Sequence, residues 1–138
     1  VTKHELQHNE LPKEIYAVST GNPHGVCIVN DFKNTPVAEW GKILTKEPIF
    51  PNEANIGFMQ IIDRENVILR VFERGVGPTL ACGSAACAAL LVGNSLNLLE
   101  KKVSVAFEYG VLTIEICPNQ TLIMTGPANS VYIGRFRV

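Results

Sequence analysis

The sequence predicts an α+β domain in which antiparallel strands surround one buried central helix. Three observations support this class. Residues 84–96 are apolar on almost every side of a helix, which is typical of a buried helix. The segments on either side alternate apolar and polar residues with period two, as strands do. A length of 138 residues suits a single domain over residues 1–138 with a substantial core.

The first two predicted elements are strands separated by a tight break. Residues 14–19 and 26–29 have the apolar and β-branched pattern of strands. Gly21-Asn22-Pro23 interrupts them, because the residue before a proline favours an extended or turn conformation. His24 is therefore expected at a loop-to-strand junction.

A helix and a pair of strands follow. Thr35 and Pro36 predict a helix start, with Thr35 as N-cap and Pro36 at the first helical position, and the helix is expected to end near Lys46. Residues 56–62 and 67–73 predict an antiparallel pair joined by a short turn. Beyond the buried helix, alternation predicts strands over residues 103–107, 112–116, 122–124 and 131–138.

The composition indicates small molecules and proteins as partners. The net charge is −1 and the basic residues are scattered, so nothing favours nucleic acid or an anionic membrane surface. No apolar run approaches the roughly 20 residues that span a bilayer. The four cysteines lack paired CxxC spacing, so we expect no metal site and read them as free thiols of a cytosolic chain.

The most informative stretch runs from Glu73 to Ala89, where a charged pair, a glycine-rich loop and a cysteine precede the buried helix. Cys82 is followed by Gly83 and Ser84 at the predicted helix start. Free backbone N–H groups and the positive end of the helix dipole meet there, which favours both a thiolate and a bound carboxylate. The pattern therefore indicates acid–base chemistry on an amino acid.

Three blocks match a known family in order and approximate spacing. They are Gly21-Asn22-Pro23-His24, Asn55-Ile56-Gly57-Phe58-Met59-Gln60, and the stretch from Glu73-Arg74-Gly75 to Ala81-Cys82-Gly83-Ser84. Together they resemble the C-terminal half of diaminopimelate epimerase, and the similarity extends from about Tyr16 to the end of the chain.

The resemblance implies both a fold and an activity. The family's domain is a β-barrel-like sheet wrapped around a helix, and its enzyme is a cytoplasmic isomerase of bacterial lysine and cell-wall biosynthesis that acts on diaminopimelate without a cofactor. The chain departs from the family at Gly25, where cysteine is frequent, and at Ala85, where glycine is frequent. Neither departure affects the cysteine of the glycine-rich stretch.

The family is built from two similar halves, and its first half has a Cys-Gly-Asn-Gly-type loop whose cysteine faces the position of Cys82 across the substrate. No such loop occurs in this sequence. We therefore expect the chain to be the later portion of a longer protein, inactive alone, with the N-terminal half as its partner. Residues 131–138 are expected to form a strand that completes that half. The resemblance also implies a homodimer of the complete enzyme.

Cys82 is the predicted catalytic thiol. Racemisation without pyridoxal needs one group to remove the α-proton and another to deliver a proton from the opposite face, and a cysteine at a helix N-terminus can reach both protonation states. The N–H groups of Gly83 and Ser84 are expected to hold the α-carboxylate. The plainer alternatives are a buried cysteine at a helix start and Ser84 as a simple N-cap. The other cysteines are interpreted as core packing: Cys27, Cys87 and Cys117.

Five further residues complete the predicted site. By resemblance, Arg74 grips the carboxylate at the non-reacting end of diaminopimelate, while Glu73 contacts the amino group there and lies near the catalytic thiol. Asn22 and Asn55 complete this distal recognition. Ordinary strand-end charges and turn-forming asparagines are the alternatives. His24 would pair with the cysteine of the other half, although a lone histidine is often only packed.

Three other functions stay open at this point. The chain could be another racemase of the same fold group, such as a proline-racemase-like protein, although the distal residues favour a longer substrate. A thiol hydrolase using Cys82 and His24 is weaker, because the loop suits a carboxylate better than an acyl intermediate. A non-catalytic amino-acid-binding module would bind diaminopimelate without exchanging its α-hydrogen.

Overall fold

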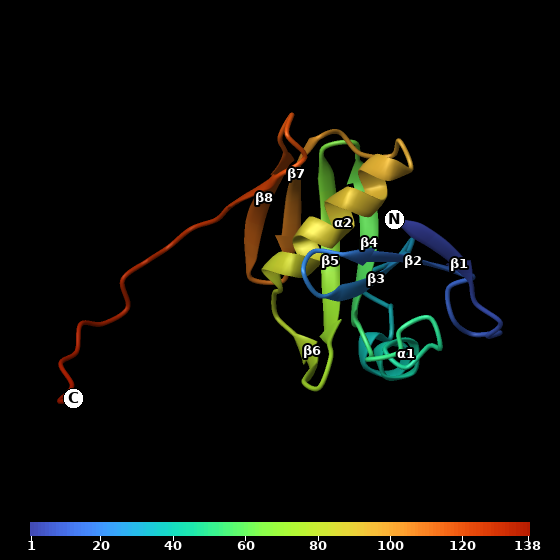
Figure 1. The fold of residues 1–138 in the computed structure, drawn as a ribbon, viewed down its shortest axis with the longest axis horizontal. Coiled ribbons are helices and arrows are strands. Elements are labelled where there is room, and N and C mark those ends of the chain that lie inside the picture. Colours follow the sequence, from blue (N-terminus) through green and yellow to red (C-terminus); the bar gives the residue numbers. More distant parts are fainter.

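The computed structural model describes residues 1–138 as one mixed sheet of nine strands with a helix packed against each face (Figure 1). The helices are α1 (Val37–Leu44) and α2 (Gly83–Ser95). The strands are β1 (Thr2–Glu5), β2 (Glu14–Ser19), β3 (Pro23–Ile28), β4 (Asn55–Asp63), β5 (Asn66–Glu73), β6 (Gly77–Thr79), β7 (Lys102–Phe107), β8 (Gly110–Ile116) and β9 (Leu122–Thr125).

The sheet is mixed, so the expectation of an antiparallel sheet is wrong at two places. The strand order is β1-β2-β3-β4-β5-β7-β8-β9, and β6 pairs with β5 beside β7. Most neighbours are antiparallel, but β3 pairs with β4 and β5 pairs with β7 in parallel. The reason is that each of these pairs is connected through a helix, and a parallel pair requires such a crossover.

The two crossovers explain why the helices lie on opposite faces. The chain passes from β3 through α1 to β4, and from β5 through α2 to β7. Both steps move the same way along the sheet, but β5 runs opposite to β4. Since crossover connections are right-handed, strands of opposite direction place their helices on opposite faces. Two separate hydrophobic clusters, one around each helix, agree with this arrangement.

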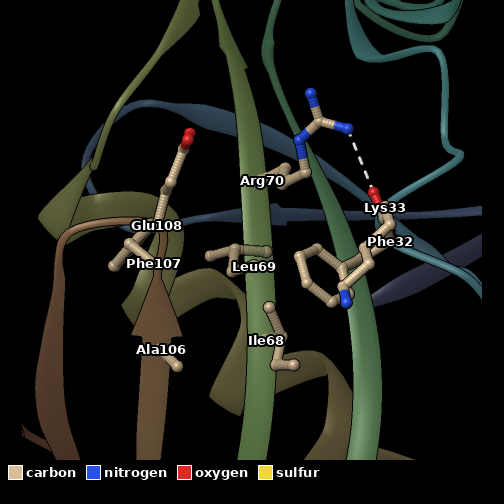
Figure 2. Close-up of a pocket in the computed structure, with 8 residues that line it drawn as sticks. All are labelled: Phe32, Lys33, Ile68, Leu69, Arg70, Ala106, Phe107 and Glu108. Carbon is tan, nitrogen blue, oxygen red and sulfur yellow. Dashed lines mark hydrogen bonds between the residues drawn. The ribbon is translucent and has the colours of Figure 1, made fainter.

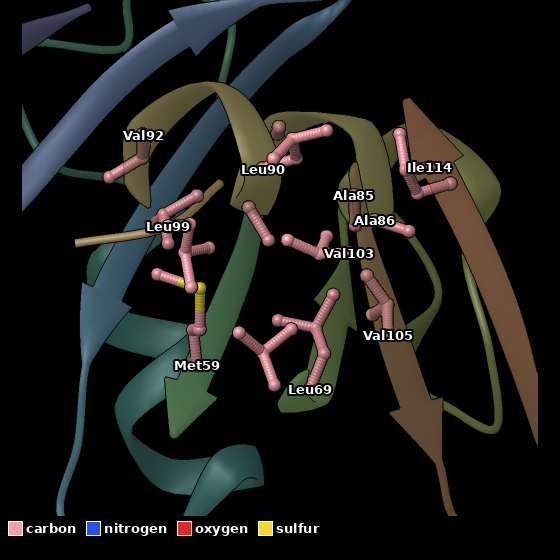
Figure 3. Close-up of a cluster of buried hydrophobic side chains, with 14 of the residues drawn as sticks. Met59, Leu69, Ala85, Ala86, Leu90, Val92, Leu99, Val103, Val105 and Ile114 are labelled. Atoms are coloured by element: carbon pink, nitrogen blue, oxygen red, sulfur yellow. The ribbon is translucent and has the colours of Figure 1, made fainter. Parts of the chain in front are cut away.

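α2 is the buried helix that the sequence predicts. Seven of its 13 residues are buried, and all of these except Gly93 belong to a cluster of 18 buried residues that includes side chains of six strands. Figure 3 shows Leu90 of α2, Val103 of β7 and Leu69 of β5 among the side chains of this cluster. Burial of a leucine side chain contributes about 1.5–3 kcal/mol relative to exposure. Hydrophobic contact on several sides therefore stabilises α2 without any charged residue.

α1 packs on the other face against a smaller cluster of nine buried residues. It buries Val37, Gly41 and Leu44, which are spaced to lie on one side of a helix. The predicted N-cap is wrong, since the N-cap position is Pro36 and the hydroxyl of Thr35 donates to the carbonyl of Asp31 at 2.6 Å. The Thr35 hydroxyl does not cap the helix because it donates to a backbone carbonyl in the preceding loop.

The remaining differences from the predicted elements are local. β3 starts at Pro23, earlier than predicted, so His24 is the second residue of this strand, close to the predicted junction, and it is buried. β1 and β6 are strands that the sequence pattern does not predict, because β1 is polar and mostly exposed and β6 has only three residues. The other strands and α2 match their predicted positions within a few residues.

The sheet curves around α2 but stays open, because β1 and β9 are its two ends and do not pair. Residues 126–138 form no strand in this chain, where the N-terminal half that residues 131–138 are expected to complete is not present, and they extend away from the body of the molecule (Figure 1). Tyr132, Ile133 and Phe136 are all exposed there. No neighbouring strand of this chain receives the segment. Neither helix is long and apolar enough to cross a membrane.

Candidate active site

Three of the predicted site residues form a row across adjacent strands. His24 of β3 pairs with Asn55 of β4, and Ile56 pairs with Phe72, which places Asn55 beside Glu73 at the end of β5. Strand alternation directs all three side chains toward the α2 face, because Ile56 belongs to the opposite cluster. Neighbouring strands lie about 4.8 Å apart. The fold therefore gathers a histidine, an amide and a carboxylate from three distant segments.

The N-terminus of α2 lies at the same end of the sheet, since α2 follows β5 and β6 and leads back to the start of β7. Cys82 is the N-cap residue with extended backbone, and no side chain caps the helix. Ala86 donates the first helical hydrogen bond, to Cys82, so the N–H groups of Gly83, Ser84 and Ala85 have no acceptor. Such free N–H groups form an anion site.

The Cys82 thiol has one polar neighbour. Its Sγ lies 3.4 Å from the hydroxyl of Ser84. The side chain is partly exposed and packs at the edge of the α2 cluster. No hydrogen bond joins this thiol to His24 or Glu73. The thiol and the strand row thus occupy the same end of the molecule without a hydrogen bond between them.

His24 is buried and carries a free base atom. Its Nε2 lies 3.2 Å from Oδ1 of Asn22, which also accepts the hydroxyl of Thr20 at 3.2 Å. A carbonyl oxygen only accepts, so Nε2 holds the proton and Nδ1, which has no partner, is the lone-pair atom. Burial lowers the pKa of His24 to about 4, against an opposing effect of the Glu73 carboxylate.

Glu73 and Arg74 are held by neighbouring backbone and side chains. Thr79 donates to Oε1 of Glu73 at 2.6 Å. The backbone N–H of Arg74 donates to Oδ1 of Asn55 at 2.9 Å, and its guanidinium donates to the carbonyl of Asn52 at 3.0 Å. Asn55 is buried and therefore fixes the end of β5. Arg74 is held beside the Asn52 loop at the rim, with guanidinium hydrogens left over for an anion.

A groove of about 500 Å³ continues from the helix end along α2. Met124 covers Gly83 there, since a Cβ added to Gly83 would lie 2.8 Å from the Met124 sulfur. Cys87 lines the groove and is only half-buried, so its assignment to the core holds in part. Burial and the nearby Cys82 raise the pKa of Cys87. Cys27 is fully buried as predicted, and burial raises its pKa to about 12.

Another depression, of about 470 Å³, lies on the other face of β5 and β7 (Figure 2). Ile68 and Ala106 line it, and Arg70 points from it toward the loop that contains Phe32. The Arg70 guanidinium donates to the carbonyls of Phe32 and Thr35 at 3.0 and 2.9 Å. None of the predicted site residues lines this depression. Its arginine, Arg70, is already hydrogen-bonded to the loop before α1.

Sequence reasoning missed several residues of the helix end. Thr79, Thr20 and Met124 all contact predicted site residues, yet hydroxyl and thioether side chains carry no distinctive spacing in the sequence. The one sequence signal near Thr79 is the pair of glycines that precede it, since glycine favours tight turns. In the structure, Gly75 and Gly77 have positive φ angles of 73° and 107° in the β5–β6 hairpin. No three His, Cys, Asp or Glu side chains are grouped to hold a metal ion.

Comparison with known proteins supplies the decisive observation. The family model described as Diaminopimelate epimerase matches residues 16–131. The chain belongs to the diaminopimelate epimerase family. It is 48% identical over 134 residues to a diaminopimelate epimerase of Ralstonia pickettii, covering 96% of this chain and 46% of that protein. The enzyme of Nitrosomonas europaea is also 48% identical, over 130 residues, which cover 94% of this chain and 47% of the relative. The chain thus spans about half the length of these relatives.

Solved structures show the same fold at lower identity. A phenazine biosynthesis protein of the PhzF family from Bacillus anthracis superposes with a TM-score of 0.55 at 19% identity, over 80% of this chain and 37% of that one. An Enterococcus faecalis member gives 0.56 at 20% identity, over 75% and 39%. These likenesses establish an α+β domain with a mixed sheet and two helices, the fold of diaminopimelate epimerase and PhzF proteins.

Proposed function

We propose that this chain is the C-terminal catalytic half of a cofactor-independent diaminopimelate epimerase. The observation that carries the proposal is the row of His24, Asn55 and Glu73 at the uncapped N-terminus of α2, where Cys82 lies. Family membership supplies the reaction, which interconverts LL- and meso-diaminopimelate for lysine and peptidoglycan precursors in the cytoplasm. The relatives' names support this reaction class.

The proposed chemistry is proton exchange between two thiols. Cys82 removes the α-proton as a thiolate from one face, and a cysteine of the N-terminal half delivers a proton to the other face. Microscopic reversal gives the opposite epimer, so the thiol and thiolate exchange places in each turnover. The N–H groups of Gly83 and Ser84 hold the α-carboxylate and stabilise the charge that develops as the α-carbon loses its proton.

The flanking residues have separate proposed roles. Glu73 assists Cys82 and contacts the distal amino group of the substrate. Arg74 binds the distal carboxylate, and Asn22 and Asn55 complete that end of the site. His24 receives the proton of the opposing thiol at Nδ1, which supports the assignment because that buried atom has no partner.

The remaining partners are proposed on the same basis. An N-terminal half with the second cysteine completes the site, and residues 131–138 form a strand within it, which is consistent with their exposed apolar side chains. An exposed strand edge recruits another segment. The complete enzyme is proposed to be a homodimer.

The test uses a fusion of the first half of the Ralstonia pickettii enzyme to this chain, called here the fusion protein. We expect the fusion protein to epimerise diaminopimelate in a chiral assay and to exchange the α-hydrogen in heavy water. The isolated chain is expected to do neither. A fusion protein that is folded and binds diaminopimelate by calorimetry, yet exchanges no α-hydrogen, would favour an amino-acid-binding module instead.

A further inference from the structure

The strongest unused contact near the site is the hydrogen bond from Thr79 to Glu73. The two oxygens are 2.6 Å apart and the pair is partly buried. Hydrogen bonds to an ionised acceptor are short and roughly twice as strong as neutral ones. Thr79 makes no other side-chain hydrogen bond, so its hydroxyl serves this carboxylate alone.

The β5–β6 hairpin fixes the geometry of this contact. Glu73 pairs with Gly77, and Val71 pairs with Thr79, so Glu73 and Thr79 are diagonal neighbours on the α2 face. Val71 belongs to the α2 cluster and confirms which face they share. The contact is therefore set by strand register and does not depend on a flexible loop.

The bond restricts what the carboxylate can do. Oε1 of Glu73 is occupied by Thr79, and Oε2 is left to meet another group. The same charge acts on the buried ring of His24, so the carboxylate lies near the row of site residues. Thr79 also stands only three residues before Cys82, in the segment that leads into α2. The β5–β6 hairpin thus positions the Glu73 carboxylate directly and leads, three residues later, to the Cys82 thiol.

We propose that Thr79 is a positioning residue that holds Glu73 in alignment with the Cys82 thiol during proton transfer. The inference rests on the proposed function, because Glu73 needs alignment only if it assists Cys82. Loss of the hydroxyl frees the carboxylate to rotate, while the hairpin pairing and the charge stay in place.

The experiment measures kcat and KM for diaminopimelate in the fusion protein. Thr79→Val is expected to lower kcat about tenfold, the effect of one hydrogen bond to a charged group, with KM changed less than about threefold. Thr79→Ser retains the hydroxyl and is expected to keep at least half of kcat. Thr113→Val, a threonine of β8 remote from the row, is the matched control and should leave kcat unchanged.

The outcomes separate the inference from the proposed function. If Glu73→Gln abolishes turnover while Thr79→Val keeps wild-type kcat, the positioning role is overturned and the proposed function stands. If Glu73→Gln itself keeps wild-type turnover, the role of Glu73 in the proposed function fails. A fall in kcat that Thr79→Ser does not rescue, together with a lower melting temperature, would also overturn positioning, since it marks a structural role. Thr79→Ala replaces the valine variant if that variant does not fold.

Discussion

The two helices of this domain differ in the charged residues at their ends. α1 has Glu39 in its first turn and Lys42 in its last, which complements the helix dipole at both ends. α2 has no acidic residue in its first turn and no basic residue in its last, and neither helix has a side-chain cap. The surface helix is thus stabilised at its ends by charge, and the buried helix is stabilised by apolar contact along its length.

This difference has a functional meaning. A carboxylate in the first turn of α2 would occupy the free N–H groups and repel an anionic substrate. Because α2 packs within a cluster of 18 buried residues, to which it contributes six, its N-terminus can stay uncapped. Packing on the sides of the helix leaves its end free for the proposed binding of an α-carboxylate.

The largest effect that tests this comparison is expected from Cys82. In the fusion protein, Cys82→Ala removes the proton carrier of one face, and we expect turnover to fall by at least about a thousandfold. Cys87→Ala, one turn further along α2, is the control and should retain most activity. The chiral assay measures both variants. A comparable loss of turnover in both variants would indicate that the reactive centre lies along the side of α2 and not at its N-terminal end.

Two glycines sharpen the contrast in stability. In Gly41→Ala of α1, the new Cβ would lie 2.3–2.5 Å from Phe72, including its Cβ, which cannot move aside without the backbone. We expect a loss of about 2 kcal/mol in the free energy of unfolding. In Gly83→Ala of α2, the clash is with the sulfur of exposed Met124, so stability should change by less than about 1 kcal/mol.

The same pair differs in function. Gly83→Ala places a methyl group at the proposed carboxylate site, so KM of the fusion protein should rise, whereas Gly41→Ala should leave KM unchanged. Urea denaturation of the isolated chain gives the stability terms. Equal destabilisation by the two alanines would show that the end of α2 is packed as tightly as the side of α1.

A smaller effect is expected from acidification. His24 stays neutral in the folded chain down to pH about 4, while in the unfolded chain it takes a proton near pH 6.5. The unfolded state therefore binds more protons between these values, and stability contributed by neutral His24 is lost as the pH falls from about 7 toward 4. The free energy of unfolding should drop more steeply in the wild type than in His24→Asn. His4→Asn on β1 is the control; parallel curves for wild type and His24→Asn would contradict the burial of the ring.

The smallest difference concerns the thiols of the isolated chain. Cys82 stands at the uncapped helix end and should react with limiting iodoacetamide about tenfold faster than Cys87, whose pKa is raised by burial. Cys27, with a pKa of about 12, should react last. Peptide mass mapping ranks them. Earlier labelling of Cys87 would mean that the groove along α2, and not its end, is the activated position.

Local patterns in the sequence predict the helices and the long strands of this domain, and they fail where non-local contacts decide. The apolar run of α2 and the alternation of β5 are visible in the chain itself. The parallel pairing of β5 with β7 is not, because it depends on where α2 returns the chain. The hydroxyl of Thr35 also escapes prediction, since its partner lies in the preceding loop.

The candidate site divides in the same way. Cys82, Gly83 and Ser84 are predicted from a local rule about helix ends. The row of His24, Asn55 and Glu73 depends on the register between three strands. This register cannot be predicted from local sequence patterns. The resemblance named these residues, and the structure adds how they are held: Thr79 on Glu73, and Asn22 on His24.

The parallel pairing of β5 with β7 also orders the folding of the domain. Asn66 meets Ser104 only after the whole of α2 has been enclosed between them, whereas β4 meets β5 and β7 meets β8 through short turns. Closing a long loop costs more entropy than closing a hairpin, so pairings of high contact order form late. The hairpins can therefore assemble first, and the end of α2 takes its direction when β7 docks on β5. The proposed anion site is thus expected among the last features to form during folding.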